Sequence, residues 1–359
     1  MRPPWSIIGR TAKPSTRRRP VNSALGVTEH YATSPMHELA AADRVEVLVL
    51  VDNVTDFLSS NPAGVEGELS RFWRQGARLQ AGHLLCCAAH GFSCAITAWS
   101  GNKSRTLLFD CGPDGQVLRN NVQRLGFDMA NVNSVFLSHG HWDHAGGMTE
   151  ALDLICAANG GLPVDTYMHP SMYQTRAMKA PDGSMRPFED VPGPGTLTAH
   201  GARVVHTTEP HLILDDLFFV SGEIPRVTSF EVGMPGQYRQ TEGGASWAPD
   251  TLLTDERFVA VRVAGKGTFV FTACSHAGVV NVLTHARNSI PGEVYGVIGG
   301  FHLAGSTERL IPDTVSEMRC FNLRLVAPAH CTGWRAVNAL AAAFGDSVAP
   351  SAVGKTYVV

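Results

Sequence analysis

The segment formed by residues 138–147 constrains this chain more than any other part of its sequence. It places four potential metal ligands within six positions: His139, His141, Asp143 and His144. An apolar run at residues 135–137 precedes the segment and two glycines end it, so we expect it to begin where a buried strand ends and a helix starts. Two imidazoles that are two residues apart can converge on one cation when the backbone is extended. These nitrogen and oxygen donors suit Zn²⁺, Mn²⁺ or Fe and do not suit Ca²⁺.

The rest of the chain alternates short apolar, β-branched runs with segments of helical periodicity. Strands are predicted at residues 45–51, 93–99, 106–109, 134–137, 164–168, 258–263, 268–272, 294–298 and 323–327. Helices are predicted at residues 115–125, 145–158, 278–288, 312–321 and 335–344. This rhythm indicates an α/β domain over residues 44–359, in which helices cover layers of sheet. Residues 170–200 and 221–250 break the rhythm, and we expect long loops there that serve function.

The first 43 residues differ in composition from the domain. Six basic side chains precede the first acidic residue, Glu29, and the segment is rich in Pro, Arg, Ser and Thr, so we expect a disordered basic tail. Met36 offers a second start codon. The sequence contains no secretory signal and no apolar run of about 20 residues, so a cytoplasmic protein without membrane partners is expected. Mitochondrial targeting by residues 1–35 is the alternative.

The overall charge and the cysteines narrow the choice of partners. A net charge of −3 in 359 residues indicates no basic surface for nucleic acid. Eight cysteines without a Cys-x-x-Cys pair are expected to be mostly buried free thiols. The exception is Cys274, which lies at the end of a predicted strand.

The His-x-His-x-Asp-His pattern resembles the metallo-β-lactamase superfamily, which implies an αββα sandwich with a two-metal site at one edge. Residues 107–112 are similar to the family's strand that ends in Asp-x-Gly, which implies that Asp110 is a hydrogen-bonding residue near the site and not a ligand. Residues 271–274 resemble the strand that normally ends in a bridging aspartate, and Cys274 stands in that place. Residues 327–330 resemble the late strand whose histidine, here His330, completes the second metal's ligands.

A narrower resemblance covers residues 45–359. Residues 52–53, 90–93, 222–226, 274–278, 299–303 and 330–333 resemble the dihydropterin-ribofuranosylaminobenzene-phosphate synthase-like proteins. Ala89 departs from that subgroup, which usually has glutamate before this His-Gly pair. The resemblance favours His276 as the third ligand of the first metal, with His211 and His206 as alternatives.

Four further residues are expected to contact the substrate or to orient the ligands, or else to be structural. His90 and His302 lie beside glycines at predicted strand ends and are otherwise buried structural histidines. Glu223 and Arg226 occupy a loop where they either meet an anionic substrate or pair with each other.

The expected function is therefore that of a metal-dependent enzyme with two ions, Zn²⁺ first and Mn²⁺ or Fe as alternatives. Asp143 is expected to ligate metal and to orient a nucleophile. The subgroup implies a small, pterin-like or anionic substrate and a transfer that displaces diphosphate to an aryl amine ribose phosphate. The alternatives are a metal-dependent hydrolase of an ester, lactone, thioester or phosphodiester, and a metal-binding protein without turnover.

Overall fold

The structure, a computed structural model, describes residues 36–359, which form one compact unit. Most of the expected tail therefore lies outside the described residues. The unit begins earlier than the boundary expected at residue 43. The side chain of Leu39 is buried, and β1 (Ala41–Ala42) pairs in parallel with β15 (Val259–Val263). The sequence did not indicate this because two residues of strand are too few to show any alternation.

Two large sheets form the centre of the unit. The first contains β2 (Arg44–Val51), β3 (Val65–Glu66), β4 (Ser93–Ser100), β5 (Lys103–Phe109), β6 (Val132–Phe136), β7 (Val164–Met168), β10 (Ala202–His206) and β19 (Thr356–Val358). Its spatial order is β10–β7–β6–β5–β4–β2–β19–β3. The second contains β11 (His211–Ile213), β12 (Phe218–Val220), β15, β16 (Gly267–Phe271), β17 (Val294–Gly300) and β18 (Leu325–Ala329), in this order, with β1 beside β15.

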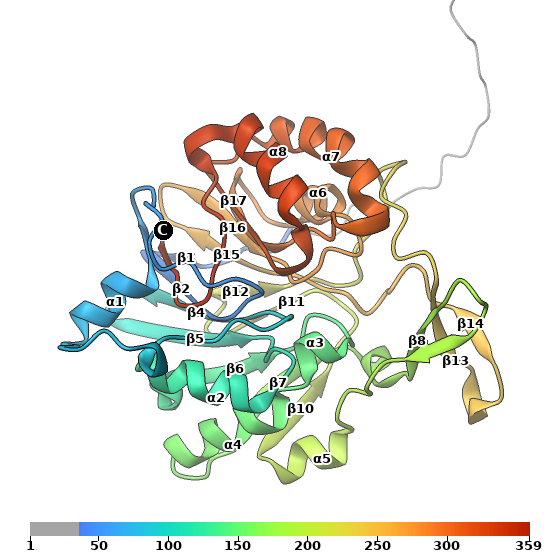
Figure 1. Cartoon of the computed structure of the whole chain (residues 1–359), viewed down its shortest axis with the longest axis horizontal. Coiled ribbons are helices and arrows are strands. Elements are labelled where there is room, and N and C mark those ends of the chain that lie inside the picture. The colour runs from blue at the N-terminus through green and yellow to red at the C-terminus, as the bar shows by residue number, and fades with distance from the viewer. Residues whose placement is uncertain (1–35) are drawn as a thin grey trace, which may run out of the picture. The chain divides into compact units, whose positions relative to one another are not determined.

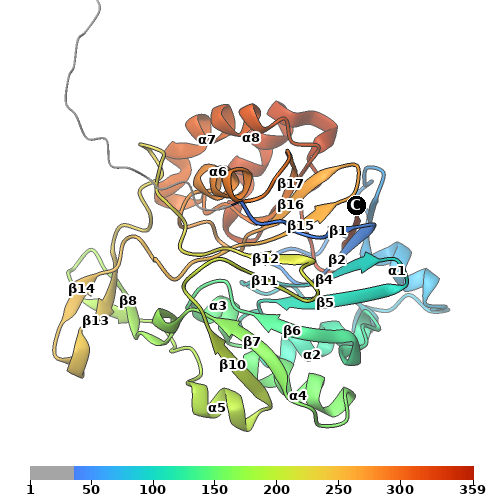
Figure 2. The same cartoon turned by 180° about the vertical axis from the view of Figure 1, so that it is seen from behind.

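The sheets pack face to face and helices cover their outer faces (Figures 1 and 2). Val47 of β2 and Val261 of β15 belong to the core between the sheets, whereas Leu48 of β2 packs on the helix side of its sheet. Strands that are buried on both faces read as continuous apolar runs, which explains residues 45–51. The αββα architecture expected from the sequence is therefore confirmed.

Two sets of helices form the outer layers. The helices α2 (Gly115–Arg124) and α4 (Met148–Ala158) cover the eight-stranded sheet. The helices α6 (Val279–Ser289), α7 (Ile311–Met318) and α8 (Trp334–Phe344) cover the seven-stranded sheet. The shorter helices are α1 (Glu68–Arg74), α3 (Trp142–Ala145) and α5 (Pro194–Ala199). Within residues 36–359, none of the helices combines the length and apolar character needed to cross a membrane.

The two stretches expected to be long loops contain a small third sheet. It is built from β8 (Arg176–Lys179), β9 (Met185–Pro187), β13 (Gln237–Gln240) and β14 (Trp247–Pro249), in the order β14–β13–β8–β9. The loop prediction is wrong here because strands of three or four residues carry too little alternation to be recognised. Their pairing joins segments about 60 residues apart, and the chain between them gives no local sign of it.

Candidate metal centre

The predicted ligands follow the carboxyl ends of strands in both large sheets. After β6 the chain bends at residues 139–140, where the His141 N–H binds the His139 carbonyl oxygen, and then enters α3, so Asp143 and His144 lie in that helix. In the second sheet β16, β17 and β18 are parallel neighbours. Because the carboxyl ends of parallel strands meet at one edge, the segments that follow these three strands lie close together.

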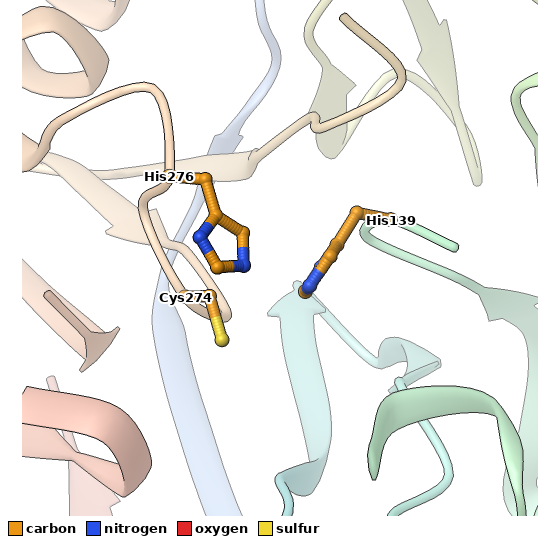
Figure 3. Close-up of side chains that lie close together, drawn as sticks. All are labelled: His139, Cys274 and His276. Atoms are coloured by element: carbon orange, nitrogen blue, oxygen red, sulfur yellow. The ribbon is translucent and has the colours of Figure 1, made fainter. Parts of the chain in front are cut away.

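Potential ligand atoms gather there in four groups, and within each group the atoms lie within 4.8 Å of one another. The groups are His139, Cys274 and His276; His144, Cys274 and His330; Cys274, His302 and Cys331; and His90, Asp143 and His330. Figure 3 shows the first group, with the side chains of all three residues pointing toward one another. The Cys274 sulfur belongs to three of the four groups, so it occupies the middle of the cluster.

Hydrogen bonds fix the tautomer of His139. The Ser138 hydroxyl donates to Asp110 Oδ2 at 2.8 Å, so its oxygen accepts a hydrogen bond from His139 Nδ1 at 2.9 Å. The proton of this neutral imidazole is therefore on Nδ1, and the Nε2 lone pair of His139 faces the cluster. A neighbour that binds the remote nitrogen of a ligating histidine is typical of metal sites.

His141 is fixed in the complementary way from β13. Gln237 donates from Nε2 to Asp250 at 3.2 Å, so its Oε1 accepts from His141 Nε2 at 2.8 Å. His141 Nδ1 is then free of a proton and lies 3.0 Å from His139 Nε2. Two lone pairs at this distance repel each other unless a cation lies between them. Nitrogen ligands bound to Zn²⁺ at 2.0–2.1 Å are about 3.4 Å apart, so the pair fits one cation.

Asp110 has the supporting role that the sequence indicates. It is fully buried at the end of β5 with φ 56°, a left-handed conformation that aspartate tolerates better than most residues. Its carboxylate accepts the Ser138 N–H at 2.7 Å and His144 Nδ1 at 2.7 Å. His144 Nε2 therefore faces the cluster, 3.2 Å from the Cys274 sulfur.

Asn53 orients two further imidazoles and gives them opposite tautomers. Its Oδ1 accepts the Gly91 N–H, and its Nδ2 donates to the His330 carbonyl oxygen, so its amide orientation is settled. His330 Nδ1 must then donate to Asn53 Oδ1 at 3.0 Å, which leaves His330 Nε2 free. In contrast, His90 Nδ1 accepts from Asn53 Nδ2 at 3.1 Å, so His90 Nε2 carries the proton. His330 is therefore suited to bind metal and His90 to donate a hydrogen bond.

Burial sets most of the protonation states. It lowers the pKa of His139 and of His276 well below the usual value, and it lowers the pKa of His141 to about 4. These imidazoles are neutral at pH 7, which is the form that binds metal. Burial also raises the pKa of the Cys274 thiol, so a cation must displace a proton to bind this sulfur.

Nearby carboxylates change the effect of burial on the pKa values of His144 and Asp143. Burial disfavours the charged form of His144, but the carboxylates of Asp143 and Asp110 outweigh it and raise the pKa to about 9. Burial opposes ionisation of Asp143, yet the neighbouring His144 and His330 lower its pKa. The set is thus arranged around a carboxylate that is ionised at neutral pH.

A further observation shows that these donor atoms suit a metal ion. Both ring nitrogens of His276 and Nε2 of His330 are buried and have no hydrogen-bond partner in the described part of the chain. Unpaired buried nitrogens are rare and cost about 1–3 kcal/mol each, and a cation would accept one lone pair from each of these rings.

The structure does not bring every candidate to the centre. His206 pairs with the Tyr173 hydroxyl, and His211 lies against the Tyr167 ring, away from the His139 cluster. Glu223 contacts His169, and the Arg226 guanidinium binds the backbone carbonyls of residues 224 and 252. Neither Glu223 nor Arg226 lines the cavity beside the cluster, and their contact with a substrate stays a prediction.

Several supporting residues were not singled out in the sequence. Arg176 of β8 is buried, binds Asp255 at 2.7 Å, and donates to the Gly140 carbonyl at 2.9 Å, while Asp255 accepts the Gly140 N–H. Glu256 accepts the backbone N–H groups of His276 and Ala277 at 2.7 and 2.6 Å. The acidic residues clustered at 250–256 could have indicated hydrogen-bond acceptors near the site, but the local sequence does not show which groups they bind.

A cavity of about 360 Å³ opens onto the cluster. Its walls include the residues His90, Trp142, Asp143, Phe188, Cys274 and Cys331. Among the described residues, no lysine or arginine lines it. Its volume is in the range of pockets for small molecules, and the charge of an anionic ligand would have to be balanced by bound cations and imidazoles.

Comparisons with known proteins agree with this architecture. A model of the family described as anti-Pycsar protein Apyc1 matches residues 95–175. The chain is 25% identical, over 80% of its length and 90% of the relative's, to 7,8-dihydropterin-6-methyl-4-(β-D-ribofuranosyl)-aminobenzene-5′-phosphate synthase of Methanocaldococcus jannaschii. It is 28% identical to an uncharacterized protein of the same organism, over 70% of this chain and 88% of that relative.

Among solved structures, the chain is similar to Tm1679, described as a metal-dependent hydrolase of the β-lactamase superfamily. The TM-score is 0.64 with 23% identity, over 87% of this chain and 98% of that one. The protein therefore has the metallo-β-lactamase fold.

Proposed function

We propose that the protein is a metal-dependent enzyme with a two-cation centre, with Zn²⁺ as the preferred ion, that displaces diphosphate from a dihydropterin-like substrate in favour of an aryl amine. The observation that carries the metal centre is the pair of facing lone pairs on His139 and His141. The reaction class is supported by the similarity to the dihydropterin synthase, which extends over 80% of the chain.

The ligand atoms separate into two sets on either side of Cys274. His139, His141 and His276 would hold one cation, and Asp143, His144 and His330 would hold the other. Cys274 lies between them, within reach of both sets. Divalent cations bound there would polarise phosphoryl oxygens and stabilise the negative charge of a departing diphosphate.

The walls of the cavity suit a flat, aromatic substrate. Trp142 and Phe188 line it, and the Phe188 ring lies 5.3 Å from the His141 ring. Aromatic faces at such distances bind planar rings by offset or edge-to-face packing.

Two residues of the chain would act on the reacting groups. His90 presents a protonated Nε2 to the cavity, 3.7 Å from Asp143 Oδ2, and 59% of its side chain is exposed. We assign it a hydrogen bond to an oxygen of the leaving diphosphate. Asp143 would accept a hydrogen bond from the amine and orient its lone pair toward the carbon. In this reaction the carbon–oxygen bond to diphosphate breaks, a carbon–nitrogen bond forms, and the proton that the amine loses passes to the solvent.

Diphosphate release tests this proposal. The full chain, loaded with Zn²⁺, is incubated with a dihydropterin that carries a methylene diphosphate group, with and without an aryl amine. We expect release that depends on the amine, together with a coupled product of the expected mass. His139→Ala should abolish release, and His206→Ala, which changes a histidine outside the cluster, should leave it unchanged. Absence of release with a fully loaded centre would contradict the proposal and favour a metal-binding protein without turnover.

Hydrolysis is the second candidate, and the exposure of the His90 side chain supports it because water can reach the centre. The same cations and the same donor would serve when water replaces the amine. Diphosphate release at equal rates with and without amine would favour hydrolysis. Lactone, thioester and phosphodiester substrates would then identify the bond that is cleaved.

A further inference from the structure

Two members of the third group of ligand atoms, His302 and Cys331, are not used by the function proposed above. The group consists of Cys274, His302 and Cys331, which follow the adjacent parallel strands β16, β17 and β18. The parallel register brings the three strand ends to one edge, so residues separated by up to 57 positions meet there. All three line the cavity of about 360 Å³.

The local contacts hold the group together. The sulfur and nitrogen atoms lie within 4.8 Å of one another, and the Cys331 thiol donates to the Cys274 carbonyl oxygen at 3.6 Å. His302 Nδ1 is buried and has no hydrogen-bond partner among the described residues. The His302 ring lies 4.5 Å from the ring of His276, so this group adjoins the first cation position.

The backbone is shaped to admit these side chains. His302 has φ 44° and His330, which precedes Cys331, has φ 46°. Such left-handed conformations are unfavourable for residues with a Cβ and are concentrated at functional sites. A Cβ at Gly300 would lie 2.4 Å from the Ala273 carbonyl oxygen and 2.6 Å from the Cys331 sulfur, so glycine is required beside both atoms. The position of the Cys331 sulfur is therefore built into the end of β17.

The third group has two sulfur atoms among its ligands, which distinguishes it chemically from the two sets of ligands proposed to hold the cations. Thiolate sulfurs select thiophilic cations such as Zn²⁺, Co²⁺ and Cd²⁺, whereas carboxylate oxygens suit harder ions such as Mn²⁺. Sulfur ligands at about 2.3 Å from a tetrahedral cation lie about 3.8 Å apart, so the atoms need to approach by about 1 Å at most. Small rotations of the Cys331 and His302 side chains would supply this movement.

We propose that Cys274, His302 and Cys331 bind a thiophilic cation, so that Cys331 is a second thiolate ligand of the metal centre. The inference rests on the proposed function for the existence of the centre, but it does not require a particular reaction. It predicts that the centre discriminates between soft and hard divalent cations through two sulfurs.

Cobalt loading tests the inference without any substrate. Co²⁺ bound by a thiolate gives a charge-transfer band in the near ultraviolet whose intensity increases with the number of thiolates. We expect the full chain to show this band, Cys331→Ser to lower its intensity by about half, and Cd²⁺ affinity to fall at least about tenfold while Mn²⁺ affinity is unchanged. Cys320→Ser, which changes an exposed cysteine, is the matched control and should leave the band intact.

A second measurement covers the case in which Cys331→Ser fails to fold. In the unmodified chain, bound Cd²⁺ should protect Cys331 and Cys274 from alkylation, and mass spectrometry of peptides would identify the protected thiols. An unchanged cobalt band in folded Cys331→Ser, or alkylation of Cys331 in the presence of bound Cd²⁺, would overturn the inference.

The two proposals fail in different ways. If cobalt binds without a thiolate band but diphosphate is released, the inference fails and the proposed function stands. If the band depends on Cys331 but no substrate reacts, the inference stands and the proposed function fails.

Discussion

The two large sheets supply their ligands to the centre in different ways. The eight-stranded sheet supplies a contiguous segment whose rings are oriented by side chains, since Asp110 binds His144 and Gln237 binds His141. The seven-stranded sheet supplies ligands from separate strand ends. There Asn53 orients the His330 ring, but the His276 ring has no hydrogen bond, and Glu256 holds only the backbone of the His276 loop. We call the residues from the eight-stranded sheet, His139 to His144, the first side of the centre and those from the seven-stranded sheet the second side. The first side is therefore organised before a cation binds, whereas His276 on the second side depends on the cation for its ring orientation.

The largest effect on stability is expected when the hydrogen bonds that organise the first side are removed. Asp110→Ala removes the acceptor of three hydrogen bonds in a fully buried place and puts alanine at φ 56°. At about 1–3 kcal/mol for each unpaired group, we expect the free energy of unfolding to fall by about 4 kcal/mol. Urea unfolding of the metal-free protein measures this change.

A matched carboxylate gives the control for this prediction. Asp128 is exposed and accepts one backbone N–H, that of Ala130, at 2.9 Å. Asp128→Ala should therefore cost only about 1 kcal/mol. Equal effects of the two substitutions would show that the Asp110 network does not stabilise the first side.

The next prediction concerns a substitution on the second side that should change metal affinity without lowering stability. His276→Ala removes a proposed ligand whose buried ring nitrogens are unpaired, so the metal-free protein should be at least as stable as the original. Metal affinity should fall by more than about 100-fold, beyond the loss typical of residues that only orient a ligand. Competition with a chelator measures the affinity. His211→Ala should retain full affinity, and retention of metal by His276→Ala would refute the assignment.

A smaller effect is expected when an orienting residue is changed on the first side. Gln237→Leu leaves the His141 Nε2–H without its acceptor at 2.8 Å, so the ring loses its fixed tautomer. Zn²⁺ affinity should fall by about 10- to 100-fold. Gln240→Leu on the same strand is the matched control, because the Gln240 side chain does not line the metal cavity. Equal affinities of the two variants would mean that the small sheet does not orient the centre.

The smallest effect is expected outside both sides of the centre. The Glu223 side chain is 53% exposed and contacts His169 rather than the cavity. Glu223→Gln should change the free energy of unfolding by less than about 0.5 kcal/mol. The rate of diphosphate release should stay the same, and a tenfold slower rate would show that this loop reaches the substrate.

The sequence predicted the first side of the centre better than the second. The apolar run before residue 138 and the spacing of His139 and His141 are local signals, and the structure has a strand followed by a helix there. Val164–Met168 was also delimited correctly because its residues alternate between buried and partly exposed positions and Gly and Pro residues precede it. Gln237 could not be found in this way, since it lies in a segment without any ligand-like spacing, and Cys331 was not singled out although it follows the predicted ligand His330.

What the sequence determined by itself is therefore what local spacing encodes: the two buried layers, the His-x-His-x-Asp-His segment and the position of Asp110 at a strand end. The tertiary structure shows how distant residues meet that segment. It places His276 and Cys274 beside His139, leaves His211 and His206 away from it, and brings Gln237 from the small sheet to His141. The physical reason is that these contacts follow from strand pairing and sheet packing between segments far apart in the chain, and the energy of such pairing is not expressed in any single stretch of residues.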